Sequence, residues 1–192
     1  HRHDRPQRAG LPLDHADRGE PVPVALYSDD VDSLLTRLAK ATENDSIDIL
    51  TQIGRRQFTS ESYSMALESF YQAFRISERI GDKKNQATLT NNIAAVYYKM
   101  DDLDNALDYF IQSLELEQEF GDRVGVSKSL NNIAIIYNEQ GQLEESLEYY
   151  REALALRDSL NDEEGKATVF NNMGLVYVKK EDYRKAITHY QR

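Results

Sequence analysis

Apolar side chains recur at an interval of 40 residues along most of the chain. Two registers share this interval: Ile93, Ile133 and Met173 with Tyr97, Tyr137 and Tyr177, and Ala66, Ala106, Ser146 and Ala186 with Phe70, Phe110, Tyr150 and Tyr190. A period of this size is typical of stacked supersecondary units, because one such unit cannot bury its apolar face alone. The pattern therefore predicts a repeat array.

Each period contains two segments with helical periodicity, separated by a short break. In the third period these segments span about 124–139 and 143–160, and they are separated by Gln140-Gly141. Glycine or asparagine can end a helix in the left-handed conformation, and aspartate can cap the helix that follows. Such pairs join the periods at Gly81-Asp82, Gly121-Asp122 and Asn161-Asp162. No strand-like alternation competes, so the sequence predicts an all-α fold of paired helices.

Small residues stand at the places where two helices of a pair would approach most closely. Ala94, Ala134 and Gly174 each follow a large apolar residue. Backbones that pack this closely leave no room for more than a methyl group. Ala106 is the expected facing residue on the second helix of its pair, with Phe110 filling the space beside the contact.

Composition excludes several classes of function. The chain has 192 residues, no cysteine and a formal net charge of −10, and 40% of its residues are hydrophobic. Without cysteine there is no disulfide, thiolate nucleophile or thiolate metal site. An acidic surface repels phosphate backbones, so nucleic acid is not an expected partner. No apolar run approaches about 18 residues, so we expect no membrane span and favour a cytoplasmic location.

The first residues of the chain differ in amino-acid composition from the repeats. All four prolines lie within residues 1–23, which indicates a disordered tail or residues left by cloning. The histidines of this tail have nothing to hold them in the geometry of a metal site. Within residues 24–44, Val31, Leu34, Leu35 and Leu38 follow the spacing of one buried helix face, so we expect a short capping helix there.

The repeated residues resemble the tetratricopeptide repeat. Its pattern of a large apolar residue, glycine, tyrosine, alanine and an aromatic residue matches Met173-Gly174, Tyr177, Ala186 and Tyr190. The first unit departs by having Gln57 in place of the tyrosine, and the third has Ser146 in place of the alanine. The 40-residue period is longer than the usual 34 and is similar to repeats of bacterial sensor kinases and regulators, kinesin light chains and Leu-Gly-Asn-repeat regulators of G proteins.

This resemblance implies a right-handed superhelical solenoid of about four helix-turn-helix repeats. We expect the repeats at about 45–82, 83–122, 123–162 and 163–192, with the last one ending inside its second helix. In such arrays the first helix of each repeat lines a concave groove. Residues that point away from the partner helix would then face that groove.

A pair of asparagines occupies one fixed place in three of the first helices. The pairs are Asn91 and Asn92, Asn131 and Asn132, and Asn171 and Asn172. An asparagine inside a helix costs roughly 0.5 kcal/mol relative to alanine, so some compensation is needed. One possibility is a ladder of hydrogen bonds between neighbouring helices, and the other is that the carboxamides hold the backbone of a bound peptide. The resemblance favours peptide binding for the second asparagine of each pair.

Other residues of the expected groove wall carry more positive than negative charge. The candidates are Arg55, Phe58, Tyr98, Lys99, Lys128, Ile135 and Lys179. The outer helices are acidic, since residues 103–120 contain five acidic residues and no lysine or arginine. This contrast would steer an acidic, partly apolar peptide into the groove. The alternative is ordinary solvated charge, which contributes little.

We therefore expect a protein-protein interaction module that binds a peptide segment of a partner, within a larger bacterial signalling protein. The alternatives are a self-association scaffold, with a possible homo-oligomer, and a eukaryotic-type adaptor. No metal, cofactor or catalytic pair is predicted, and His189 is expected to be a surface residue rather than a general base.

Overall fold

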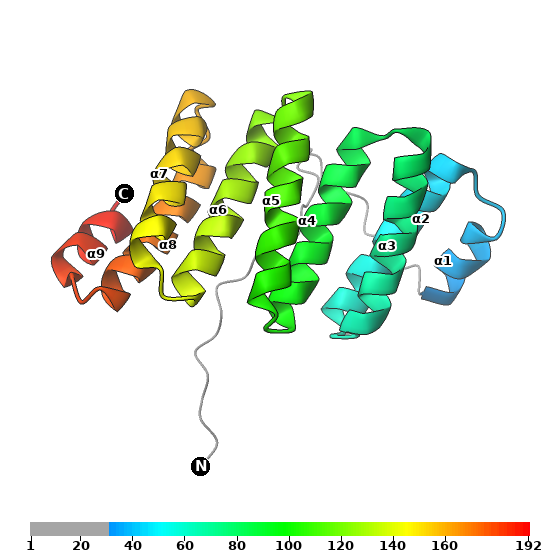
Figure 1. Ribbon diagram of the computed structural model, residues 1–192, viewed down its shortest axis with the longest axis horizontal. Coiled ribbons are helices and arrows are strands. Elements are labelled where there is room, and N and C mark those ends of the chain that lie inside the picture. Colours follow the sequence, from blue (N-terminus) through cyan, green and yellow to red (C-terminus); the bar gives the residue numbers. More distant parts are fainter. Residues whose placement is uncertain (1–30) are drawn as a thin grey trace, which may run out of the picture.

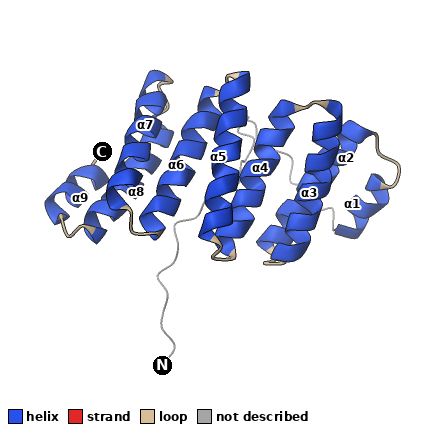
Figure 2. Cartoon of the chain, viewed as in Figure 1, coloured by secondary structure: helices blue, strands red, loops and turns tan. Residues whose placement is uncertain are grey.

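The computed structural model describes residues 31–192, which form helices and contain no strand (Figures 1 and 2). The helices are α1 (Val31–Leu38), α2 (Glu43–Thr59), α3 (Tyr63–Ile80), α4 (Lys83–Lys99), α5 (Leu103–Phe120), α6 (Arg123–Glu139), α7 (Leu143–Ser159), α8 (Glu163–Lys179) and α9 (Tyr183–Tyr190). The all-α prediction is confirmed. The predicted tail, residues 1–23, lies outside the described residues, as do residues 24–30 of the segment expected to hold a capping helix.

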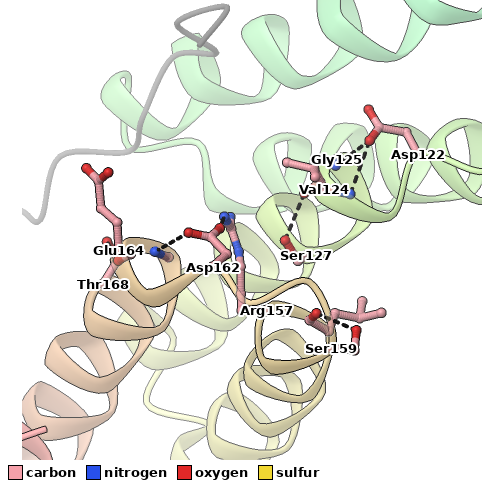
Figure 3. Close-up of polar contacts among 11 residues, drawn as sticks. Asp122, Val124, Gly125, Ser127, Arg157, Ser159, Asp162, Glu164 and Thr168 are labelled. Atoms are coloured by element: carbon pink, nitrogen blue, oxygen red, sulfur yellow. Dashed lines mark hydrogen bonds and ion pairs between the residues drawn. The ribbon is translucent and has the colours of Figure 1, made fainter. Parts of the chain in front are cut away.

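Aspartates begin the first helix of the later repeats. Asp122 Oδ1 accepts from the Gly125 N–H at 2.9 Å, and Asp162 Oδ1 accepts from the Gly165 N–H at 2.8 Å. Figure 3 shows Asp122 beside Val124 and Gly125 at the start of α6, and Asp162 beside the Arg157 side chain. The preceding residue is left-handed, as at Gly121 with φ 83° and Asn161 with φ 55°. The joints expected from the sequence are thus present, and each joint reverses the direction of the chain between one repeat and the next.

The predicted close contacts hold each hairpin together. Ala94, Ala106 and Phe110 are fully buried between α4 and α5. A methyl group added at Gly174 would collide with the ring of Tyr190. The small residues are therefore required by helix packing.

A second repeated contact lies beside the small residues. Tyr97 stacks on Tyr109 with ring centroids 5.5 Å apart, and Tyr137 stacks on Tyr149 at 5.2 Å. Tyr177 instead stacks on His189, at 5.0 Å. In the first repeat the same two positions hold Gln57 and Ser69, and the Ser69 hydroxyl donates to Gln57 Oε1 at 2.7 Å. The first repeat thus replaces an aromatic stack with a buried hydrogen bond.

The hairpins follow one another in a row from α1 to α9, as Figure 1 shows. Among residues 31–192, close backbone approaches join α2 to α4 and α6 to α8, whereas no comparable set joins α3 to α5, α5 to α7 or α7 to α9. Two of the three pairs of successive first helices therefore approach each other more closely than any pair of successive second helices. We call the layer of first helices the first-helix side, and it is the inner side of the array.

Candidate functional site

The paired asparagines form a hydrogen-bond ladder across the first-helix side. The Asn132 carboxamide donates from Nδ2 to Asn91 Oδ1 at 3.1 Å. One repeat further on, Asn172 Nδ2 donates to Asn131 Oδ1 at 3.0 Å. Each bond joins residues 41 positions apart, so it connects neighbouring first helices. The interhelical alternative is confirmed for these four residues.

Burial limits the hydrogen bonds that the paired asparagines can make with a bound peptide. Asn92 and Asn132 are 0% and 1% exposed, and Asn91, Asn131 and Asn172 are no more than 9% exposed. A carboxamide that is sealed between helices does not present its donors and acceptor to a peptide backbone. Asn171, by contrast, is exposed. Peptide contact by the asparagine pairs stays a prediction, and Asn171 is the member of the set that a peptide can reach directly.

The ladder is incomplete at its first step. Both the oxygen and the nitrogen of the Asn92 carboxamide are buried without a hydrogen-bond partner. The position that would accept from Asn92 is occupied by Thr51, whose hydroxyl donates to the Ile47 carbonyl at 2.7 Å. A buried polar group left unsatisfied costs about 1 to 3 kcal/mol. The sequence carried this signal, because Thr51 stands where the other repeats have asparagine.

Two of the expected wall residues belong to the core instead. Tyr98 is fully buried and Ile135 is 3% exposed. Tyr98 on α4 and Ile135 on α6 lie on the side of their helix that faces the next repeat. The next repeat packs against that side and buries them. This corrects their expected orientation toward the groove. A helical wheel drawn for one helix could not show which flank its neighbour would cover.

The remaining candidates are accessible to different degrees. Arg55, Phe58, Lys99 and Lys128 are half-buried, and Lys179 is exposed. Phe58 packs edge-on against Tyr63, and Lys99 Nζ lies 6.0 Å from the centre of the Tyr98 ring. Lys179 Nζ donates to the Asn138 carbonyl at 2.9 Å and lies 3.9 Å from Glu139 Oε2. These side chains are spread over α2, α4, α6 and α8, and they do not converge on one point.

One hollow brings two of the predicted residues together. It lies between the beginnings of α4 and α6 and the end of α5, and we call it the α4–α6 hollow. Its lining includes Lys84, Thr88, Asn91, Glu117, Phe120, Asp122, Val124 and Lys128. Asn91 and Lys128 were expected from the sequence, whereas Lys84, Phe120 and Val124 were missed. Lys84 and Val124 lie one helical turn before Thr88 and Lys128, so the i, i+4 spacing could have found them.

The α4–α6 hollow combines charge with apolar surface. Lys84 and Lys128 supply ammonium groups, and Phe120 and Val124 are 39% and 42% exposed. The carboxylates of Glu117 and Asp122 equal the two ammonium groups in number, but both are already engaged within the protein. Asp122 caps α6, and Glu117 Oε1 accepts from the Ser113 hydroxyl at 3.2 Å. The hollow can therefore hold a small apolar side chain next to an acidic one.

Residues 31–192 show no group of three or more histidines, aspartates and glutamates that could hold a metal ion. Within the same residues, every helix is too short or too polar to cross a membrane.

Solved structures with the same architecture share little sequence with this chain. BtubC (BKLC) from P. vanneervenii superposes with a TM-score of 0.71 at 22% identity over 84% of this chain and 67% of its own. The Rap conjugation gene regulator of plasmid pLS20, in complex with a Phr peptide, gives a TM-score of 0.67 at 17% identity over 76% of this chain and 40% of its own. At these identities the likeness extends to the fold alone.

A third solved structure contains a sensor region. The STAND protein with a tetratricopeptide repeat sensor from Pyrococcus horikoshii gives a TM-score of 0.76 at 19% identity, over 83% of this chain and 25% of its own. Comparison with curated protein sequences gives no significant match. The sequence model of the tetratricopeptide repeat matches residues 45–119, 85–159 and 125–192. These matches together span most of the chain, which therefore belongs to the tetratricopeptide repeat family.

Proposed function

We propose that the chain captures a peptide segment of a protein partner on its first-helix side, with the α4–α6 hollow as an anchoring point. The observation that carries this proposal is the lining of the hollow, where Lys84 and Lys128 lie beside the partly exposed Phe120 and Val124. Ammonium groups next to apolar surface suit a peptide that carries a carboxylate beside an aliphatic or aromatic side chain. The preferred guest is thus acidic and partly apolar.

Similar structures are consistent with this role. The pLS20 Rap regulator was solved with a bound peptide, and the STAND protein carries its repeats as a sensor. By analogy of fold, we place this array in the regulatory or sensing part of a larger signalling protein, where it acts by binding rather than by catalysis.

Charge reversal in the hollow tests the proposal. Peptides selected from a random library against the intact chain are measured by calorimetric titration with the Lys84→Glu/Lys128→Glu variant. We expect at least a tenfold loss of affinity, with the loss largest at low salt because the contacts are electrostatic. Lys84→Glu alone should leave the melting temperature unchanged, since Lys84 is exposed. The Lys128 charge acts on Asp162, which caps α8, so the double variant is titrated at a temperature at which circular dichroism shows it to be folded.

A matched control uses the outer side of the array. Arg151 on α7 is exposed, so Arg151→Glu changes charge by the same amount per site without touching the hollow. Equal weakening by this control would show that binding responds to net charge and not to the hollow. Selected peptides that lack acidic residues would also contradict the proposed guest.

A further inference from the structure

One hydrogen bond of the carboxamide ladder, which we call the hollow rung, lies against the α4–α6 hollow. Asn91 lines this hollow together with Lys84 and Lys128. Asn91 is also the acceptor of the hollow rung, because its Oδ1 atom accepts from Asn132 Nδ2 at 3.1 Å. The ladder and the hollow therefore share one side chain.

The hollow rung determines which atom of Asn91 remains for the hollow. A carboxamide carries an acceptor oxygen on one side and a donor nitrogen on the other. Since Asn132 holds the oxygen of Asn91, the nitrogen is turned the other way. Within residues 31–192, Asn91 Nδ2 makes no hydrogen bond, and it is not sealed from solvent as both carboxamide atoms of Asn92 are. The hollow thus receives a hydrogen-bond donor from Asn91.

Asn132 itself lies too deep to touch a bound peptide. It is 1% exposed, and its own oxygen is buried without a hydrogen-bond partner. It follows Lys128 by four residues on α6, so it lies on the same side of that helix, one turn further along. Any influence of Asn132 on a peptide in the hollow is therefore transmitted through Asn91.

Stability alone does not account for the hollow rung. A buried polar atom without a partner costs more than an ordinary hydrogen bond contributes, so the bond to Asn91 does not compensate for the unpaired oxygen of Asn132. Replacing both partners of a buried hydrogen bond by apolar groups of the same shape can be neutral or stabilising. Leucine at both positions would thus serve the packing of α4 against α6 equally well.

The donors around the hollow favour one kind of chemical group. Lys84 and Lys128 place ammonium groups beside the Asn91 N–H, and all three groups donate. A carboxylate only accepts, and its two oxygens can accept from several donors at once. A carboxamide of the same size would instead turn N–H groups toward these donors at some of its positions.

We propose that Asn132 is a positioning residue for the α4–α6 hollow, where it turns Asn91 Nδ2 toward the carboxylate of an aspartate or glutamate in the bound peptide. This inference rests on the proposed peptide capture. It adds the reason why the hollow selects an acidic side chain over the corresponding amide.

The orientation of the two carboxamides can be measured in the protein without a peptide. Hydrogen exchange of the side-chain N–H groups is followed by NMR. The Asn132 amide is buried and donates, so it should exchange at least about tenfold more slowly than the Asn91 amide. The reverse order would place the nitrogen of Asn91 against Asn132 and overturn the inference.

The role in binding is tested with the peptides selected for the charge-reversal experiment. Each peptide is compared with a copy in which glutamine or asparagine replaces the acidic residue that contributes most to affinity. The Asn91→Leu/Asn132→Leu variant should keep its melting temperature, bind the acidic peptide about tenfold more weakly and lose most of its preference for the acid. Asn132→Leu alone should also weaken binding, but it should have little further effect once Asn91 is leucine.

The other hydrogen bond of the ladder provides the matched control. Asn172 donates to Asn131, both are buried, and neither lines the hollow. Asn131→Leu/Asn172→Leu removes the same kind of bond one repeat further on. It should leave the affinity for the peptide and the preference for the acid unchanged.

The possible results separate the inference from the proposed function. Equal weakening by the two leucine pairs, or a lower melting temperature for the hollow pair alone, would assign the hollow rung to stability and overturn the inference. An unchanged preference for the acid would also overturn it, while weakening by Lys84→Glu/Lys128→Glu would leave peptide capture standing. Failure of the charge reversal to weaken binding would overturn both.

Discussion

At the scale of single residues, the repeats differ most where one position departs from its equivalents. Asn92 lacks the hydrogen bond that Asn132 and Asn172 make, because Thr51 replaces the expected asparagine. His189 replaces the tyrosine that stands at 109 and 149. Each departure gives a substitution that restores the pattern of the other repeats.

Replacing Thr51 by asparagine should stabilise the array. The new carboxamide would accept from Asn92 Nδ2, which satisfies a buried donor, and we expect about 1 kcal/mol of added stability. A rise of a few degrees in melting temperature, measured by circular dichroism, checks this. Thr88→Asn is the control, because the Thr88 hydroxyl also donates to a carbonyl four residues earlier, at 3.1 Å, but no unsatisfied amide faces it. Equal effects of the two substitutions would argue against the extended ladder.

His189 should make stability depend on pH. Burial, together with the nearby Arg192 guanidinium, holds the pKa of His189 below its ordinary value of about 6.5. The unfolded chain therefore takes up the proton first, so stability is fully present above pH 6.5 and is lost as pH falls through the lower pKa of the folded state. His189→Tyr should reduce the fall in melting temperature between about pH 7.5 and 5.5. An unchanged difference would place the pH sensitivity elsewhere.

At the scale of the helices, the sequence predicted the elements well. The Gly-Asp and Asn-Asp joints fix the ends of the helices, and the small residues fix how each pair packs. Tyr98 and Ile135 were misplaced because their surroundings depend on how one hairpin crosses the next. The spacing of apolar residues in the sequence predicts which side of a helix packs against the other helix of the same repeat. It does not predict which side is buried by the next repeat, because that depends on how successive repeats pack in three dimensions.

Enlarging a small residue at a helix contact should weaken one hairpin. Ala106 is fully buried between α4 and α5, so Ala106→Leu overpacks the contact, and we expect a loss of about 1 to 3 kcal/mol. Urea denaturation checks this value. Met65→Leu, at an exposed position of α3, should change the free energy of unfolding by less than about 0.5 kcal/mol. A tolerated leucine at 106 would mean that the helices can separate without loss.

At the scale of the whole molecule, stability should vary along the array. A repeat array is held by contacts between neighbouring helices, and within residues 31–192 α1 packs mainly against α2 and α9 mainly against α8, whereas α4 packs against α3 and α5, and α6 against α5 and α7. Helices α1 and α9 contain 8 residues each, whereas α4 and α6 contain 17 and lie between two hairpins. Amide hydrogen exchange should be fastest in α1 and α9 and slowest in α4 and α6. Uniform protection along the array would indicate that it unfolds as one unit.

The architecture of the whole molecule was more predictable than its binding site. Periodicity and capping residues are repeated four times and support one another, so the array follows from them. The charge of the α4–α6 hollow depends on two lysines that do not repeat, because the positions of Lys84 and Lys128 hold Val124 and Thr88 in the neighbouring repeats. The 40-residue period therefore does not predict this combination. Asn171 is exposed while Asn91 and Asn131 are buried, although the sequence around them is alike.

The carboxamide ladder also has a direction. Every bond runs from a donor in the later repeat to an acceptor in the earlier one, so the N-terminal rung offers the donor of Asn92 and the C-terminal rung offers the acceptor of Asn171. Because of this direction, an identical repeat can be inserted into the middle of the array without leaving an additional carboxamide donor or acceptor unpaired. A gene in which residues 123–162 are duplicated in tandem should therefore encode a longer protein that still folds.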